Sequence, residues 1–212
     1  PMTIQTVPST DPANGTRLTS VKPGAITLVR HGEPALSRRV KLDSAGYRNW
    51  WAAYELGGLL EGQTPPRPVV DSALQASVRY ASTRKRALET ARAICGELCF
   101  QPDSMFIEAP LPPPNFPSFL KFSPGTWGVI ARFWWWAFDH HEGQETRKQA
   151  EARAELAAAK LIEDALTGQN VMLMAHGYFN GMIGLELARR GWTCVHKGGF
   201  KYWSRLRFEK KA

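Results

Sequence analysis

The stretch AITLVRHGE, residues 25–33, decides the fold of this chain. Its apolar run is short and leads into a glycine, which is typical of a strand buried on both faces. Arg30 and His31 follow the apolar residues, and open α/β sheets bind their ligands at this carboxyl end of the strands. Gly32 has no side chain, so a ligand can approach the backbone closely. We therefore expect a binding site at residues 30–32.

The same pattern returns late in the chain. Residues 171–175, VMLMA, form an apolar run that is followed by His176 and Gly177. A single histidine near a strand end is more often structural than functional. Two His-Gly pairs in matching positions are harder to explain in that way, because the carboxyl ends of parallel strands meet at one edge. The sequence therefore predicts that His31 and His176 share a pocket.

Basic residues open the helix that we expect after a second strand. Residues 81–91 read ASTRKRALETA, with Arg84, Lys85 and Arg86 at the expected helix start. Cations there oppose the helix dipole, whereas an anionic ligand gains from both the helix end and the guanidinium groups. This favours an anion site. An ordinary solvated charge cluster is the alternative for Lys85 and Arg84.

Apolar runs and amphipathic segments alternate along the rest of the chain. We expect strands at 25–30, 77–82, 105–108, 170–175 and 200–208, helices at 84–100, 145–167 and 179–190, and helical spacing at 44–60. Such alternation predicts an α/β fold. The expected domain organisation is an N-terminal arm at 1–24, rich in Pro, Thr and Ser, and a single domain at 25–212.

Aromatic residues concentrate in one segment, residues 116–138. It holds nine of the 23 aromatic residues in the chain. A membrane-spanning helix needs about 20 apolar residues, and this segment is interrupted by Lys121, Pro124, Gly125, Gly128 and Arg132. We therefore expect no transmembrane segment. A lid over the pocket, a hydrophobic core, a homodimer interface and peripheral docking to a membrane surface remain alternatives for this segment.

Composition excludes several classes of protein. The 212 residues carry a net charge of +8, yet eight basic residues and one acidic residue fall within 189–212, so the remainder is almost neutral. Without a nucleic-acid motif, this pattern argues against nucleic-acid binding. The three cysteines do not form a disulfide framework and favour a reducing, cytoplasmic location.

Taken together, RHG at 30–32, STRKRALETA at 82–91 and HG at 176–177 resemble the histidine phosphatase superfamily, also called phosphoglycerate mutase-like. The resemblance spans residues 25–208 in the expected order. It implies a three-layer αβα sandwich with a mostly parallel central sheet, and it identifies residues 109–143 as an aromatic-rich cap inserted in the domain.

The resemblance also implies roles for single residues. His31 matches the nucleophile that is phosphorylated during turnover. Arg30, Arg86 and His176 match the groups that hold the phosphoryl group, and His176 also stabilises it during transfer. Glu108 fits the position of the general acid, in a Pro-rich setting unlike that of the mutases. These residue types suit phosphoryl transfer, which needs an in-line nucleophile and charge stabilisation.

Neither a metal nor a cofactor is implied by this site. His140, His141 and His196 lack partners at metal-ligand spacing. Glu145 resembles a family Gly-Glu-Ser segment and is interpreted as structural.

The sequence therefore predicts a metal-independent phosphatase acting on phosphomonoesters, with bulky or hydrophobic small molecules as preferred substrates. A phosphoglycerate-mutase-type phosphotransferase, a protein phosphohistidine phosphatase and an inactive binding protein on the same fold are the alternatives.

Overall fold

The computed structural model describes residues 20–211 of the chain. Most of the expected N-terminal arm therefore lies outside the described residues. Six strands form one sheet in the order β3-β2-β4-β1-β6-β5. Their bounds are β1 Ile26–Arg30, β2 Val78–Ala81, β3 Gln101–Pro102, β4 Val171–Ala175, β5 Trp192–Lys197 and β6 Arg205–Lys210. Strands β3, β2, β4 and β1 run parallel, β6 pairs antiparallel with β1, and β5 pairs antiparallel with β6 at the edge of the sheet.

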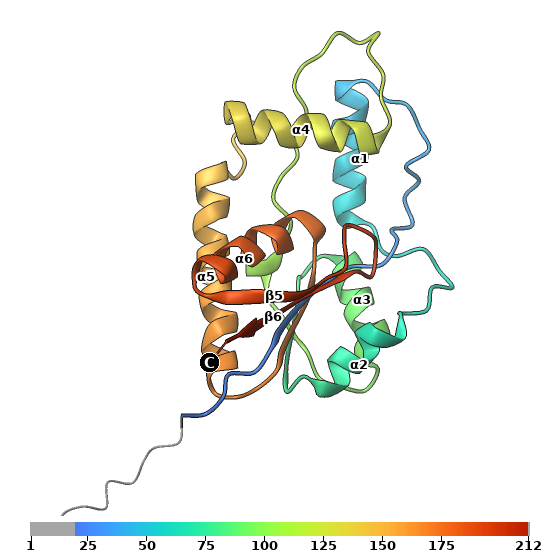
Figure 1. Ribbon diagram of the computed structural model, residues 1–212. Coiled ribbons are helices and arrows are strands. Elements are labelled where there is room, and N and C mark those ends of the chain that lie inside the picture. The colour runs from blue at the N-terminus through green and yellow to red at the C-terminus, as the bar shows by residue number, and fades with distance from the viewer. Residues whose placement is uncertain (1–19, 212) are drawn as a thin grey trace, which may run out of the picture.

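Helices cover both faces of this sheet (Figure 1). The α-helices of the described residues are α1 Ser44–Leu56, α2 Arg67–Gln75, α3 Lys85–Cys95, α4 Pro124–Phe138, α5 Arg147–Leu166 and α6 Gly177–Arg189, and four of them pack on the sheet. Helices α5 and α6 pack on one face through a core that includes Leu161, Phe179 and Leu173. Helices α2 and α3 pack on the other through Val69, Ile94 and neighbouring residues. This confirms the three-layer αβα sandwich with a mostly parallel sheet.

The register of the central strands places the two histidines beside each other. Strands β1 and β4 pair in parallel with Arg30 opposite Ala175, so the next residue of each strand is a histidine. The His31 amide donates to the carbonyl of Ala175 over 3.0 Å, which extends the pairing by one more residue. Because neighbouring strands lie about 4.8 Å apart, the sheet itself brings these two side chains together.

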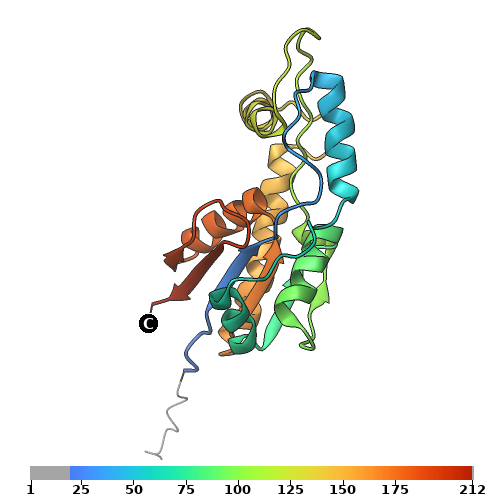
Figure 2. The same ribbon diagram turned by 90° about the vertical axis from the view of Figure 1, so that its right-hand side faces the viewer.

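Helices α1 and α4 stand beyond the sheet, at the end to which β1 leads (Figure 2). Aromatic side chains join them, with Tyr47 stacked against both Trp50 and Trp127. Helix α4 begins with Ser123 as its N-cap and Pro124 in its first turn, a favourable combination for a helix start. None of the helices within residues 20–211 is long and apolar enough to cross a membrane.

Several element predictions were wrong. The strand expected at 105–108 is absent; a 3₁₀ turn occupies Ser104–Phe106, where the Asp103 carboxylate accepts from the Met105 amide, and the short β3 precedes it. The helix expected to reach residue 100 ends at Cys95, because Gly96 adopts a positive φ of 58°. Helices α2 and α4 and strand β5 were not predicted, and the last strand begins at Arg205 instead of residue 200.

Candidate active site

The two histidines form the floor of the site. Both are buried, and their ring centroids lie 5.4 Å apart in an edge-to-face arrangement. His31 Nδ1 lies 2.7 Å from the carbonyl oxygen of Gly32. A carbonyl only accepts, so Nδ1 carries the proton and Nε2 keeps a free lone pair. His176 Nε2 contacts the Ser82 hydroxyl at 2.8 Å, and its Nδ1 has no partner within the described part of the chain.

Two arginines flank the histidines. Arg86 is fully buried; it donates to Glu55 over 2.7 Å and to the carbonyl of Tyr54 over 3.3 Å. Arg30 lies over the ring of Tyr202 at 4.5 Å. The Nε atoms of both arginines are buried and lack a partner among residues 20–211. Buried donors without partners are costly, so the pair is well suited to an anion.

Glu108 lies at the amino-terminal end of α6. Its carboxylate accepts from the backbone amides of Tyr178 at 3.2 Å and Phe179 at 2.9 Å. These two contacts hold the carboxyl group of Glu108 in a fixed position. The same residue lines the cavity that contains His31, so the expected general acid and the expected nucleophile face one space.

That space is a chamber of about 520 Å³. Aromatic side chains make up much of its wall: Tyr47, Trp50, Trp51, Tyr54, Phe133, Trp136, Tyr178 and Phe200. Four arginines also line it: Arg30, Arg38, Arg86 and Arg132. The chamber therefore combines a cationic end with an apolar body, as a phosphoester with an apolar leaving group would require.

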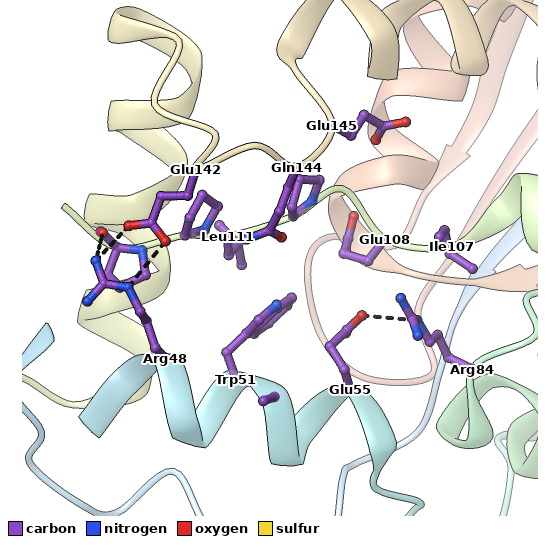
Figure 3. Close-up of a pocket in the computed structure, with 14 residues that line it drawn as sticks. Arg48, Trp51, Glu55, Arg84, Ile107, Glu108, Leu111, Glu142, Gln144 and Glu145 are labelled. Carbon is purple, nitrogen blue, oxygen red and sulfur yellow. Dashed lines mark hydrogen bonds and ion pairs between the residues drawn. The ribbon is translucent and has the colours of Figure 1, made fainter. Parts of the chain in front are cut away.

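A second hollow of about 480 Å³ adjoins the chamber and shares Trp51, Glu108 and Leu111 with it. Figure 3 shows Trp51 and Glu55 on α1 facing Glu108 across this hollow, and the ion pair between Glu55 and Arg84. Glu55 thus binds two arginines at once, Arg84 at 3.0 Å and Arg86 at 2.7 Å. It fixes the guanidinium group of Arg86 while leaving Nε unpartnered.

The sequence did not reveal the part that three residues play in this site. Glu55 lies in the last turn of α1 and belongs to no motif, so only the tertiary structure reveals its pairing with Arg86. Arg132 lies within the aromatic segment and donates to the carbonyls of Ala109 and Pro110, directly after Glu108. Ser82 could have been found, because it begins the STRKRALETA motif.

The remaining polar residues singled out from the sequence lie outside the chamber. Glu145 forms a two-pronged ion pair with Arg153, at 2.8 and 2.9 Å. His140 and His141 lie in the loop after α4, and His196 on β5. Residues 20–211 contain no group of three or more His, Cys, Asp or Glu side chains placed to hold a metal ion.

Burial sets the protonation of both histidines. Burial, reinforced by the positive charge of Arg86, holds the pKa values of His31 and His176 well below the ordinary histidine value. The unfolded chain binds protons as the pH falls through about 6.5, while the folded chain does not. The free energy of unfolding therefore decreases as the pH falls below that value.

We expect urea unfolding to show this loss between pH 7.5 and pH 5.5, with each histidine contributing up to about 1.4 kcal/mol per pH unit. Saturating tungstate should make the free energy of unfolding depend less steeply on pH, because a bound anion favours protonated imidazole in the folded protein. A slope that tungstate leaves unchanged would mean that other groups cause the pH dependence.

Fold and site together define an α/β protein that brings two buried histidines and two arginines together at the carboxyl end of its parallel strands. A family model described as histidine phosphatase superfamily (branch 1) matches residues 26–198. The chain belongs to this superfamily, as the three motifs predicted. A search of curated protein sequences finds no match.

Solved structures with a similar fold include three phosphatases. The mycobacterial glucosyl-3-phosphoglycerate phosphatase in complex with VO₃ is 17% identical, with a TM-score of 0.55 over 87% of this chain and 92% of that one. A histidine-to-alanine mutant of the phosphoserine phosphatase of Entamoeba histolytica, in complex with phosphoserine, is 14% identical, with a TM-score of 0.53 over 88% of this chain and 96% of that one. The ecdysone phosphate phosphatase of Bombyx mori, bound to tungstate, is 13% identical, with a TM-score of 0.51 over 89% and 92%. At such identities the likeness is one of fold.

Proposed function

We propose that this protein is a metal-independent phosphatase that hydrolyses phosphomonoesters through a phosphohistidine intermediate on His31. The observation that carries the proposal is the 2.7 Å contact between His31 Nδ1 and the Gly32 carbonyl, which assigns the proton to Nδ1 and leaves the lone pair on Nε2. Arg30 and Arg86 lie nearby, each with an Nε donor that has no partner among residues 20–211. Membership of the histidine phosphatase superfamily supports the same class of reaction.

The first step transfers the phosphoryl group to the protein. Arg30, Arg86 and His176 bind the phosphate oxygens and offset their charge. The lone pair on His31 Nε2 forms a bond to phosphorus, while the bond from phosphorus to the leaving oxygen breaks. Glu108, in its carboxylic acid form, gives its proton to that oxygen, so the product leaves as an alcohol or phenol.

The second step returns the protein to its starting state. The Glu108 carboxylate takes a proton from a water molecule as the water oxygen bonds to phosphorus. The bond from phosphorus to His31 Nε2 breaks, its electron pair returns to the imidazole, and inorganic phosphate is released. Neither step uses a redox change or a metal ion.

The preferred substrates follow from the chamber. Beyond the phosphate-binding end, its wall is formed by residues such as Tyr47, Trp51, Phe133 and Trp136. These side chains offer apolar area and stacking surfaces, which suit aryl or other bulky apolar leaving groups better than a sugar. Trp136 and Phe133 are about half exposed, so a substrate that covers them removes apolar surface from water.

A panel of phosphoesters tests both parts of this proposal. With EDTA present throughout, we expect kcat/KM for 1-naphthyl phosphate to exceed that for glucose 6-phosphate at least tenfold. That ratio corresponds to about 1.4 kcal/mol of transition-state binding. Sugar phosphates as the better substrates would contradict the proposed preference, and turnover that stops with EDTA would contradict the metal-independent mechanism.

A further inference from the structure

Helix α4 is apolar on both its inner and its outer face. Arg132 is the charged residue among its 15, and it donates inward to two backbone carbonyls beside Glu108. Trp127 and Trp135 are fully buried on the inner face. A helix on the surface of a protein normally carries charged residues on its outer face. In α4 that face has none, and the nearest acidic residue in the chain, Asp139, comes only at the C-cap.

The outer face of α4 exposes large apolar side chains instead. Val129 is 72% exposed, and Phe133 and Trp136 are about half exposed. They are spaced by four and three residues, so they form one stripe along the helix. The same three side chains line the aromatic chamber, as does Phe200, which is 83% exposed in the loop between β5 and β6. These four residues form the apolar rim of the chamber. Figure 1 shows α4 across the end of the molecule far from the C-terminus.

Three chain segments meet at the apolar rim, and none of them contains an acidic residue. Residues 109–138 carry the stripe, residues 192–208 carry Phe200, and residues 34–42 join the first segment through two backbone hydrogen bonds of 2.9 Å between Leu42 and Phe122. The exposed basic residues of these segments are Arg38, Arg39, Lys41, Lys121, Lys197 and Lys201. Within these segments, all the exposed charges are therefore positive.

Charge separates the two kinds of partner that would cover such a rim. In a symmetric dimer the same surface meets itself, so Arg38 and Lys121 would be brought toward like charges. A membrane surface with anionic lipids offers the opposite charge, and tryptophan is favoured at the boundary between headgroups and acyl chains. With 15 residues, α4 is too short to span a bilayer, but it can lie along one.

We propose that the apolar rim and the basic residues beside it form a docking surface for a membrane that contains anionic lipids. Val129, Phe133, Trp136 and Phe200 enter the headgroup region, and the lysine and arginine side chains contact lipid phosphates. Because the rim belongs to the chamber, docking turns the chamber toward the bilayer, where phosphoesters with an apolar chain can enter it. This last consequence rests on the proposed function, whereas the docking does not.

Co-sedimentation with vesicles tests the docking without any use of catalysis. We expect the full chain to bind phosphatidylcholine vesicles with one third phosphatidylglycerol at least tenfold more tightly than vesicles of phosphatidylcholine alone. Added salt should weaken the binding, because it screens the attraction between the charges. Equal affinity for both kinds of vesicle, or no binding to the anionic vesicles at low salt, would overturn the proposal.

A matched pair of double variants tests the part played by the apolar rim. Phe133→Ser with Trp136→Ser should weaken binding to the anionic vesicles at least tenfold. Leu156→Ser with Leu166→Ser, which removes two exposed apolar side chains from α5, should leave the affinity within twofold. Phe200→Ser, in a loop, gives a second test if circular dichroism shows the first variant unfolded, and it should weaken binding at least threefold. Equal losses in rim and control variants would reject the rim as the docking surface.

A second pair separates local charge from net charge. Arg39→Glu with Lys41→Glu and Arg92→Glu with Lys211→Glu change the net charge by the same amount, but Arg92 lies on α3 and Lys211 near the C-terminus. The first pair of substitutions should weaken binding at least tenfold and the second at most threefold. Equal losses would mean that net charge alone draws the protein to the vesicles, which contradicts a defined docking surface.

Light scattering tests the alternative occupant, a second copy of the chain. The unaltered protein should be a monomer at the concentrations used with vesicles. A dimer that dissociates in the Phe133→Ser, Trp136→Ser variant would assign the rim to a contact between two copies and overturn the proposal.

Discussion

His31→Ala is expected to lower kcat/KM for 1-naphthyl phosphate by at least about 10⁴-fold, because it removes the group proposed to attack phosphorus. In the unaltered protein, rapid quenching during turnover should trap a phosphoprotein that is labile to acid and stable to base. The variant should form none. Steady-state rates and mass spectrometry of quenched samples measure the two effects.

His196→Ala is the matched control, since His196 lies on β5 outside the chamber. It should keep both the rate and the phosphoprotein. Turnover by His31→Ala at the normal rate would reject the covalent mechanism. A complete lack of hydrolysis and of phosphoprotein in the unaltered protein, across the whole substrate panel, would favour a binding protein on the same fold.

Glu108→Gln is expected to have the second-largest effect, and the size should depend on the leaving group. General acid catalysis contributes about 10²–10⁴-fold. For 1-naphthyl phosphate, whose leaving oxygen is relatively basic, we expect kcat/KM to fall about 10³-fold. For 4-nitrophenyl phosphate, whose anion leaves without help, transfer to His31 should be affected far less.

The exposed Glu97→Gln serves as the control and should change neither rate. Rapid-quench experiments with 4-nitrophenyl phosphate should also show phosphoprotein accumulating in Glu108→Gln, because the base that activates water is missing. Equal losses for both substrates, with no such accumulation, would mean that Glu108 positions other groups instead of transferring a proton.

The sequence could predict the core of the site because short-range patterns encode it. An apolar strand followed by His-Gly needs no tertiary information, and the parallel pairing of β1 with β4 then fixes where His31 and His176 lie. The helix start at residues 84–86 is equally local, so Arg86 could be assigned before its contacts were known.

The chamber could not be predicted in the same way. Its shape depends on α1 packing against α4 through Tyr47 and Trp127, which are 80 positions apart in the chain. Within residues 116–138, glycines and a proline obscured the helix, although Ser123 and Pro124 are good residues for its start. The arginine-binding role of Glu55 has no sequence signal at all.

Proline and edge effects explain two missed elements. Helix α2 follows a pair of prolines and contains a third at its second position, a composition that usually indicates a loop. Strand β5 is the outer strand of the sheet and is exposed along most of its length. It therefore lacks the apolar run by which buried strands such as β1 were found.

The aromatic wall gives the protein an unusual optical property. Of its eight tryptophans, six belong to α1 and α4: Trp50, Trp51, Trp127, Trp134, Trp135 and Trp136. Only Trp192 and Trp203 lie elsewhere. Intrinsic fluorescence therefore reports mainly on helices α1 and α4, and three of their tryptophans, Trp50, Trp51 and Trp136, line the chamber. Stacked neighbours such as Trp50 and Tyr54, 5.0 Å apart, can exchange excitation energy. Entry of a ligand into the chamber can be followed by emission alone, without an attached dye.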